Sequence, residues 1–303
     1  MKLSEAINEW LNAKRIENLS ERTIDGYDYF INQMLDYLGD MPLEQFDASK
    51  VRAFIGYQGR REGRFGELSD ATIMKYYSVV RSFSRWLADQ DYKIKVPTNK
   101  VKPPKVERKL PEALSDDEVE RLYRYLKAYC SERVQLIFEF FMDTGARLTE
   151  VVDINIDDVN LRDGWVKVYG KGRKERILPL GRNLKRDLKA YIEKIRPMIA
   201  ETDEQALFVT QQGSRYAREG LSTLIKTKMK KVGVKGHYGP HKLRHTFATN
   251  YLRNQGGLEQ LRIQMGHTDI STTQIYLSLV PDDLVRAQQH ASPNDKFRDR
   301  LDI

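Results

Sequence analysis

The segment HKLRH, residues 241–245, contains the densest group of side chains that could carry chemistry. On a helix, His241 and Arg244 would share one face, and His241 and His245 have the i,i+4 spacing of paired metal ligands. Zinc helices with this spacing place a glutamate directly after the first histidine, but Lys242 stands there instead. Because a lysine beside a cation site is unfavourable, we reject the metal interpretation. We expect no metal and no cofactor, and we interpret His245 as a structural histidine.

Two other clusters place a basic side chain close to glycine. In TGARLTE, residues 144–150, Gly145 permits a sharp bend that leaves Arg147 at or near the start of the next helix. In GKGRKER, residues 170–176, two glycines flank Lys171, so the backbone can approach a ligand closely and expose the ammonium group. Taken singly, the first cluster is an ordinary surface arginine paired with a glutamate one turn later, and the second is an ordinary basic turn.

The fourth cluster is GHTDISTTQIY, residues 266–276, in which Tyr276 stands nine residues after His267. Ser271 and Gln274 have the spacing of a capping box, and an isoleucine on either side provides a hydrophobic staple. The pattern predicts that a new helix begins here and that Tyr276 lies in its second turn. A single tyrosine on a helix is most often a packing residue, so its meaning depends on the side chains near it.

The elements that position these clusters begin with an N-terminal domain of helices. Ser20 and Ser69 have the sequence context of N-caps, and Gly39 is placed to end the helix that follows Ser20. Apolar side chains recur at helical spacing in three stretches, Ile24–Leu38, Val51–Ile55 and Ile73–Leu87. We expect an all-helical domain over residues 1–92.

Residues 93–113 differ in composition from the sequence on either side. Four prolines oppose the continuation of a helix, namely Pro97, Pro103, Pro104 and Pro111. Basic side chains outnumber acidic ones here, among them Lys100, Lys102 and Lys105. We therefore expect an extended basic linker between two domains. It is either a solvated connector or a strap along a phosphate backbone.

A second domain is expected over residues 114–303. Ser115 begins a capping box before an apolar run, and helical patterns fill residues 115–157. The pattern Trp165–Tyr169 predicts a strand, and a glycine-rich turn returns the chain as a second strand over Ile177–Leu180. Because the rest is mostly helical, the fold class is mainly α with a small β-hairpin or sheet.

Composition limits the partners and the compartment of the chain. The formal net charge of +8 and the pI of about 9.3 favour a polyanionic partner, most commonly nucleic acid. Cys130 is the only cysteine, which excludes an intramolecular disulfide and is consistent with a reducing compartment. The sequence has no apolar stretch of about 20 residues and no signal-peptide core, so we expect a cytoplasmic protein with no membrane partner.

Six side chains of the four clusters follow one another in a fixed order: Arg147, Lys171, His241, Arg244, His267 and Tyr276. This order, together with the phrases GKGRKERILPLG, HKLRHTFAT and GHTDISTTQIY, resembles the tyrosine recombinase (phage integrase) family and its Xer-like branch. The resemblance covers nearly the whole chain, because the N-terminal region is similar to the family's SAM-like core-binding domain. Ala146 and Met265 stand where leucine is more usual, and residues 277–279 are less polar than the family pattern.

The resemblance implies cleavage and rejoining of DNA without a metal. Tyr276 would attack a phosphodiester and form a 3′-phosphotyrosine, and strand exchange would pass through a Holliday junction without ATP. Arg147 and Arg244 would bind the non-bridging oxygens through charge-assisted hydrogen bonds. Free tyrosine has a pKa of about 10, so it must lose its proton during the attack.

The same resemblance assigns the remaining polar groups. His241 is implied as the base that takes the tyrosine's proton, and His267 as a group that binds or positions the phosphate. Lys171, on the glycine-flanked turn, is implied as the acid that protonates the leaving 5′ oxygen.

The implied partner is double-stranded DNA that carries specific recombination sites, bound by a tetramer on two duplexes. The core-binding and catalytic domains would form a C-shaped clamp around the DNA. Basic side chains of the linker and the hairpin are candidate DNA contacts: Lys100, Lys102, Lys105, Arg173 and Lys174. The tail after Tyr276 either docks on a neighbouring protomer, as in the family, or packs within its own chain. Integration, excision and dimer resolution all fit the sequence, and no accessory protein is indicated.

Two other functions fit part of this pattern. A type IB topoisomerase shares the fold and chemistry but relaxes DNA as a monomer, and the small helical N-terminal domain and the Xer-like phrases argue against it. A non-catalytic DNA-binding protein would not need the complete set of six residues.

Overall fold

Three of the helix starts that the sequence predicts are present in the computed structural model. Ser20, Ser69 and Ser115 are N-caps, and each hydroxyl accepts a hydrogen bond from a backbone N–H of the first turn. Glu118 completes the predicted capping box by accepting from the backbone N–H of Ser115. Gly39 ends the helix that Ser20 begins, as expected.

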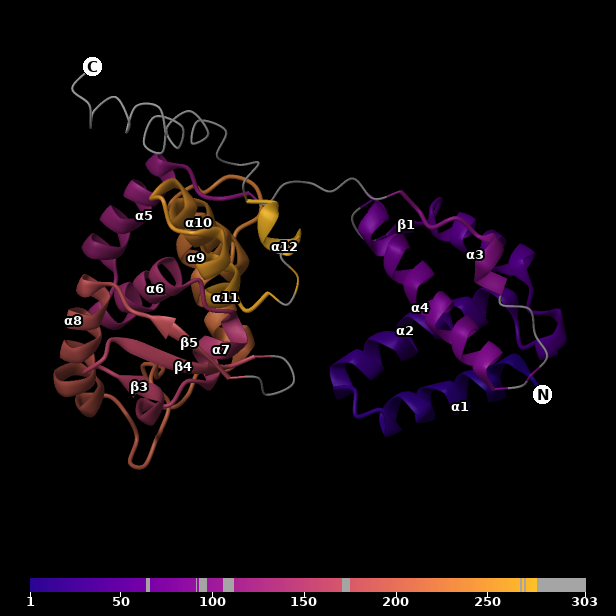
Figure 1. The fold of residues 1–303 in the computed structure, drawn as a ribbon, viewed down its shortest axis with the longest axis horizontal. Coiled ribbons are helices and arrows are strands. Elements are labelled where there is room, and N and C mark those ends of the chain that lie inside the picture. The colour runs from indigo at the N-terminus through magenta and orange to yellow at the C-terminus, as the bar shows by residue number, and fades with distance from the viewer. Residues whose placement is uncertain are drawn as a thin grey trace, which may run out of the picture. The chain divides into compact units, whose positions relative to one another are not determined.

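The structure describes residues 1–63, 66–90, 92, 97–105, 112–170, 175–267, 269 and 271–276. The chain divides into two compact units, Met1–Lys109 and Leu110–Ile303 (Figure 1). Each unit buries a cluster of apolar side chains of its own.

Helices dominate the first unit. Its elements are α1 (Leu3–Ile16), α2 (Glu21–Leu38), η1 (Leu43–Gln45), α3 (Ala48–Gln58), β1 (Glu62–Gly63), β2 (Gly66–Glu67), α4 (Asp70–Asp89) and η2 (Pro97–Lys100). The core lies where α1, α2, α3 and α4 meet, around the fully buried Trp10, Phe54 and Phe83. The antiparallel pair β1–β2 corrects the expectation of an all-helical domain. Each strand has only two residues, which is too short to show the alternating apolar pattern that would predict a strand.

One described part of the predicted linker is not extended. Residues Pro97–Lys100 form a 3-10 turn, and Thr98 and Val101 are buried. The Tyr77 hydroxyl donates a hydrogen bond of 3.0 Å to the carbonyl of Val101, which therefore packs with the helical core. Proline fixes φ near a value that suits a tight turn as well as an extended chain, so the prolines alone did not decide between them. Lys100, Lys102 and Lys105 stay exposed.

The second unit combines helices with one small sheet. Its helices are α5 (Asp116–Tyr129), α6 (Glu132–Thr144), α7 (Leu148–Asp153), η3 (Ile156–Asp158), α8 (Arg182–Ala190), η5 (Tyr191–Ile195), η6 (Arg196–Met198), α9 (Arg218–Lys231), α10 (Pro240–Arg253), α11 (Leu258–Met265) and α12 (Ser271–Gln274). Helix α6 lies at the centre and contacts α5, α8 and α10. Its buried Ile137, Phe140 and Phe141 form the middle of the core.

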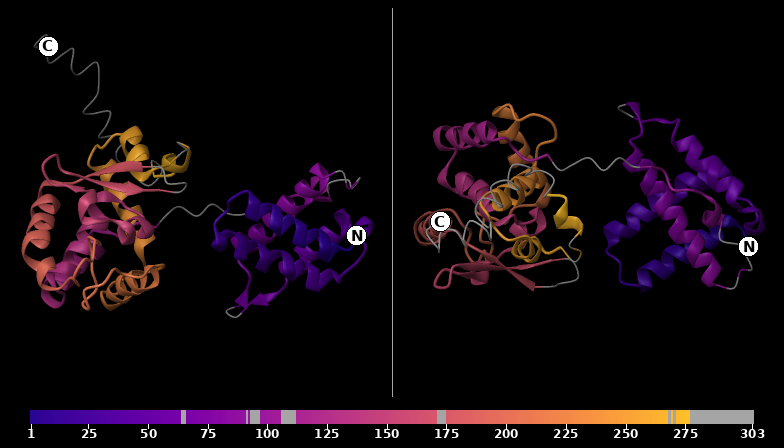
Figure 2. Two further views of the ribbon diagram at one scale, coloured as in Figure 1. Left: turned by 90° about the horizontal axis from the view of Figure 1, so that it is seen from below. Right: turned by 45° about the horizontal axis from the view of Figure 1, so that its top comes forward.

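The sheet is antiparallel with the order β3 (Val159–Asn160), β4 (Trp165–Tyr169) and β5 (Glu175–Pro179). Figure 2 shows it along one side of the unit's helices. Strand β4 has the predicted bounds, whereas β3 was not predicted and β5 begins two residues earlier than expected. The earlier start brings Arg176 into the strand, on the same face as the buried Leu178. Among the described residues, none of the helices has the length and apolar character needed to cross a membrane.

Candidate active site

Arg147 is positioned by the bend between α6 and α7. Gly145 ends α6 in the left-handed conformation with φ +63°, and Arg147 is the N-cap of α7, as the sequence predicts. A Cβ atom at Gly145 would lie 2.2 Å from the ring of Phe247 on α10, so the close approach of these helices requires glycine. The side chain of Arg147 is one-third exposed and thus accessible to a ligand.

A buried carboxylate joins Arg147 to a second arginine. Glu150 is only 2% exposed, and it accepts hydrogen bonds from the backbone N–H of Arg147 at 2.7 Å and from its Nη1 at 3.0 Å. Arg176 donates to both Glu150 oxygens, with 2.8 Å from Nη2 to Oε2. Burial acts to raise the pKa of Glu150, but the hydrogen bonds and charges of Arg176 and Arg147 hold it below its usual value. The carboxylate therefore stays ionised and fixes both guanidinium groups.

Arg244 lies deeper than Arg147 and projects from α10. It is 5% exposed, and it donates from Nη1 to the carbonyl of Gly145 and from Nη2 to the carbonyl of Met265. Burial and the charges of Arg147 and Arg176 lower the pKa of Arg244 to about 9, so it remains charged at neutral pH. Two backbone carbonyls thus hold the guanidinium of Arg244 in place, next to the positive charges of two other arginines.

His267 lies beside Arg244, at the end of α11. Its Nε2 is 3.4 Å from Nη2 of Arg244, and its Nδ1 is 2.9 Å from the hydroxyl of the buried Thr273. Burial and the charge of Arg244 lower the pKa of His267 to about 4, which makes the ring neutral at physiological pH. The preceding Gly266 has φ +62°, and its carbonyl accepts a hydrogen bond of 3.1 Å from Arg147. A Cβ atom at Gly266 would lie 3.0 Å from Arg176, so the absence of a side chain there leaves room for the guanidinium groups.

Tyr276 is buried rather than presented at the surface. It is 1% exposed and packs with side chains of α10 and α11, beside which α12 lies (Figure 1). Helix α12 ends at Gln274, so Tyr276 lies in a turn after the helix and not in its second turn as expected. The predicted cap at Ser271 and staple at Ile270 fall outside the described side chains. Burial raises the pKa of Tyr276, although the charge of Arg244 partly opposes the rise.

The Tyr276 hydroxyl contacts a histidine that the sequence did not single out for chemistry. Its Oη is 2.6 Å from Nδ1 of His245, the residue that follows Arg244 on α10. His241, one turn earlier, is exposed and makes no hydrogen bond with any described residue. The i,i+4 spacing correctly places both histidines on one side of α10, but spacing alone does not show which of them meets the tyrosine.

The structure therefore brings together four of the six predicted catalytic side chains, Arg147, Arg244, His267 and Tyr276, with His241 one turn from His245 on α10. Lys171, Arg173 and Lys174 lie outside the described residues. Glu150 and Arg176 were missed as site residues. A charged side chain on the inward face of a strand needs a buried partner, so the alternation of β5 could have indicated Arg176.

An open cavity of about 710 Å³ lies directly beside these groups. Arg147, Arg176, Arg262, Arg218, Glu150 and His267 are among its lining residues. Two of these arginines have acidic partners of their own at the surface, Glu259 for Arg262 and Asp153 for Arg218. The lining holds four arginines against three carboxylates, Glu150, Asp153 and Glu175, so the cavity has a small excess of positive charge. Within the described part of the chain, no three His, Cys, Asp or Glu side chains gather as metal ligands would.

A comparison with protein families finds two matches that together span most of the chain. Residues 112–281 match the phage integrase family, and residues 7–91 match the phage integrase N-terminal SAM-like domain. The boundary between the matches falls in the segment that joins the two compact units.

Individual relatives agree with this result. The chain is 37% identical over 278 residues to tyrosine recombinase XerD of Staphylococcus epidermidis, covering 89% of this chain and 92% of the relative. It is 35% identical over 282 residues to XerD of Oceanobacillus iheyensis, covering 90% and 93%. The fold is similar to that of XerH site-specific recombinase bound to its difH substrate, with a TM-score of 0.72 at 22% identity over 93% of this chain and 82% of that one.

Proposed function

This chain belongs to the phage integrase family, and from that membership we propose that it is a tyrosine site-specific recombinase that cleaves and rejoins DNA at recombination sites. The observation that carries the proposal is the placement of Tyr276 beside Arg244, in a site that also holds Arg147 and His267. Positive charge and a hydroxyl nucleophile are the two things that metal-free attack on a phosphodiester needs.

We assign the two arginines to the phosphate. As Tyr276 attacks, negative charge gathers on the non-bridging oxygens, and the forked donors of Arg147 and Arg244 can bind these oxygens. His267 is neutral and lies beside Arg244, so we propose that it helps to position the same group. Tyr276 then holds the 3′ phosphate as an ester, which conserves the bond energy for rejoining.

Lys171 is proposed as the acid that protonates the leaving 5′ oxygen. The family resemblance supports this role, and the hairpin that carries Lys171 joins β4 to β5, the strand of Arg176. His241 was expected to take the proton of Tyr276. We keep this role as a proposal: burial and the charges of Arg244 and Arg147 lower the pKa of His241, so its ring is neutral and lies within the field of the two arginines.

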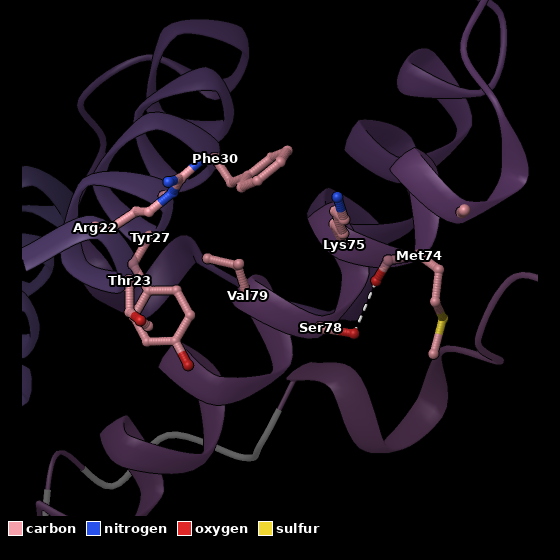
Figure 3. A pocket seen from close by; sticks show the side chains of 10 residues that line it. Arg22, Thr23, Tyr27, Phe30, Met74, Lys75, Ser78 and Val79 are labelled. Atoms are coloured by element: carbon pink, nitrogen blue, oxygen red, sulfur yellow. Dashed lines mark hydrogen bonds between the residues drawn. The ribbon is translucent and has the colours of Figure 1, made fainter. Parts of the chain in front are cut away.

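We propose that the N-terminal unit binds DNA through α2 and α4. A cavity of about 300 Å³ lies between these helices, with Arg22, Tyr27, Phe30, Met74 and Lys75 in its wall (Figure 3). A second cavity continues along α4 past Met74 and Ser78 to two further arginines, Arg81 and Arg85. The apolar side chains inside these cavities and the basic side chains around them suit the edge of a DNA groove and its phosphates.

Lys100, Lys102 and Lys105 are exposed and follow α4 in the sequence, and we propose them as DNA contacts. Arg173 and Lys174 are proposed as further DNA contacts. We propose a domain organisation of 1–92, 93–113 and 114–303, with the outer two domains clamping the duplex. Four protomers on two duplexes, acting in the cytoplasm, would complete strand exchange. XerH, which shares the fold, is described as bound to its DNA substrate in a post-cleavage complex.

The test has two stages. Sequencing of the DNA ends that become linked to the protein in cells identifies a recombination site, and a duplex of that site with a nick near the cleavage point then traps the intermediate. We expect an adduct that survives SDS, forms in EDTA and is absent with Tyr276→Phe. Binding of the site without any adduct would contradict the recombinase proposal and favour a non-catalytic DNA-binding protein. Relaxation of supercoiled DNA by monomers on arbitrary sequence would favour a type IB topoisomerase.

A further inference from the structure

Arg176 is a buried cation of the site to which the proposed chemistry gives no role. It lies on the same face of β5 as the buried Leu178, and its side chain is 10% exposed. A guanidinium keeps its charge in proteins, so one that is this well buried needs partners for its charge and its donors. Its Nε donates to the carbonyl of Gln264 at 2.9 Å, and both of its Nη atoms donate to Glu150.

The carboxylate of Glu150 divides its hydrogen bonds equally between two arginines. Oε1 accepts from Nη1 of Arg147 at 3.0 Å and from Nη1 of Arg176. Oε2 accepts from the backbone N–H of Arg147 at 2.7 Å and from Nη2 of Arg176 at 2.8 Å. A carboxylate offers about four lone-pair sites. All of them are therefore in use, and Arg147 is only one of two cations that face this buried anion.

The sum of these charges determines how much positive charge Arg147 can offer to a phosphate. Arg147 and Glu150 alone would be a neutral ion pair, whereas two guanidinium groups on one carboxylate leave one positive charge over. The side chain of Arg147 is 33% exposed and that of Arg176 only 10%. The surplus charge is therefore offered to a ligand mainly through Arg147, although Arg176 supplies it.

The hydrogen-bond geometry leads to the same conclusion. Nη1 of Arg147 donates to Glu150, and Nη2 donates to the carbonyl of Gly266 at 3.1 Å. Each of these nitrogens carries a second N–H group, which can serve a phosphate oxygen. Without Arg176, two acceptor positions of a buried carboxylate would open beside these same donors. Glu150 would then compete with the phosphate for Arg147.

We propose that Arg176 is a positioning residue for cleavage, which neutralises Glu150 so that Arg147 keeps its charge and its donors for the phosphate. The inference rests on the recombinase function proposed above. A Cβ atom at Gly266 would lie 3.0 Å from Nη1 of Arg176 and 3.2 Å from Nη1 of Arg147, so both guanidinium groups pack against this glycine. Arg176 thus acts on the reaction through Arg147 and needs no contact with the DNA.

The experiment removes the charge of Arg176 and then the charge that it neutralises. Arg176→Met keeps most of the length of the side chain without its charge. We expect its single-turnover cleavage of the nicked site, with protein in excess, to fall by about 10–100-fold, the size typical of residues that orient the ligands of metal sites. Adding Glu150→Gln should recover most of this loss, because the amide oxygen can still accept from Arg147 but no longer holds its charge.

Folding is measured separately from cleavage. Urea unfolding and DNA binding are followed for each variant, and rates are compared for the folded protein. Arg176→Gln, which is neutral but can donate to Glu150, takes the place of Arg176→Met if that variant does not fold. The control is Arg186→Met, because Arg186 is exposed on α8, where it pairs with Asp187, and its loss should leave cleavage unchanged.

Two results would overturn the inference. Cleavage at the wild-type rate by folded Arg176→Met would show that Arg176 only supports the fold. A slow Arg176→Met that Glu150→Gln does not restore would show that Arg176 acts on the phosphate itself rather than through Arg147. Absence of an adduct in the unsubstituted protein would instead count against the recombinase function.

Discussion

The positive charges and the nucleophile of this site are held in different ways. We call Arg147, Arg176, Arg244 and the buried Glu150 the arginine frame. Charge-assisted hydrogen bonds link the frame, and its arginines also donate to backbone carbonyls of the turn after α6, of α11 and of the turn after α11. Residues 271–276, which we call the nucleophile segment, are joined to the rest of the site by hydrogen bonds to two neutral histidines. One contact joins His245 to Tyr276, and the other joins His267 to Thr273.

The difference indicates which part of the site is complete before DNA arrives. The frame has its charges in place and its counter-charge buried, which is what electrostatic preorganisation requires. Tyr276 is protonated and covered, and the described side-chain hydrogen bonds of its segment include those of Tyr276 and Thr273 to two histidines. The anion site formed by the arginine frame is therefore charged and ordered without a phosphate bound to it.

Breaking the frame at its carboxylate should have the largest effect on stability. Glu150→Gln leaves the charges of Arg147 and Arg176 without their buried partner, and removal of one member of a buried ion pair costs roughly 3–5 kcal/mol. Urea unfolding of the catalytic unit would measure this loss. Glu120→Gln is the control, because Glu120 pairs with Arg124 at the surface and its loss should leave the free energy of unfolding nearly unchanged. Equal effects of the two substitutions would contradict the account of the frame.

The next effect is on catalysis and concerns the geometry of a single guanidinium. Arg244→Lys keeps the charge but loses the planar fork that reaches two backbone carbonyls and a phosphate. Loss of one preorganised donor costs about 10²–10³-fold in rate. Single-turnover cleavage measures it, with Arg253→Lys in the exposed last turn of α10 as the control. A wild-type rate for Arg244→Lys would show that charge alone suffices.

A smaller effect is expected in the nucleophile segment. Thr273→Val removes the hydroxyl that meets Nδ1 of His267 while keeping the volume of the buried side chain, at a cost of about 1 kcal/mol. Thr272→Val, at the exposed neighbouring position, is the control. Hydrogen exchange of residues 271–276 should rise in Thr273→Val, and exchange of α7 should not. Equal increases in both regions would mean that the frame and the segment form one unit.

Lowering the pH should destabilise the nucleophile segment before it destabilises the arginine frame. His245 and His267 have pKa values near 4 in the folded chain and near 6.5 when released, so opening takes up protons and becomes easier as pH falls from about 6.5 toward 4. Glu150 stays ionised in this window, because its pKa is lowered. Hydrogen exchange of the nucleophile segment, corrected for its intrinsic pH dependence, should therefore rise before that of α7. The opposite order would refute this assignment.

The sequence indicated the residue types of the site better than the buried hydrogen bonds that hold them in place. The fixed order of residue types singled out Arg147, Arg244, His267 and Tyr276, which the structure places together, and their catalytic roles stay predictions. Glu150 was recognised only as an ordinary ion-pair partner, since its burial depends on helix packing. Arg176 was missed because β5 was expected to begin two residues later.

His245 shows most clearly where sequence reasoning stopped. Its spacing from His241 is compatible with a structural role, and only the packing of α10 against the segment 31 residues later brings its Nδ1 to the tyrosine. In the N-terminal unit, caps and apolar spacing predicted the helices well, whereas the β1–β2 pair and the turn at η2 depend on backbone pairing and burial that carry little local signal.

The measurement that tests the central claim most directly is the identity of the residue linked to DNA. The trapped adduct would be digested with trypsin and nuclease, and the modified peptide sequenced by mass spectrometry. The account predicts a nucleotide attached through its 3′ phosphate to the hydroxyl of Tyr276. Attachment to any other residue, or through a 5′ phosphate, would contradict it.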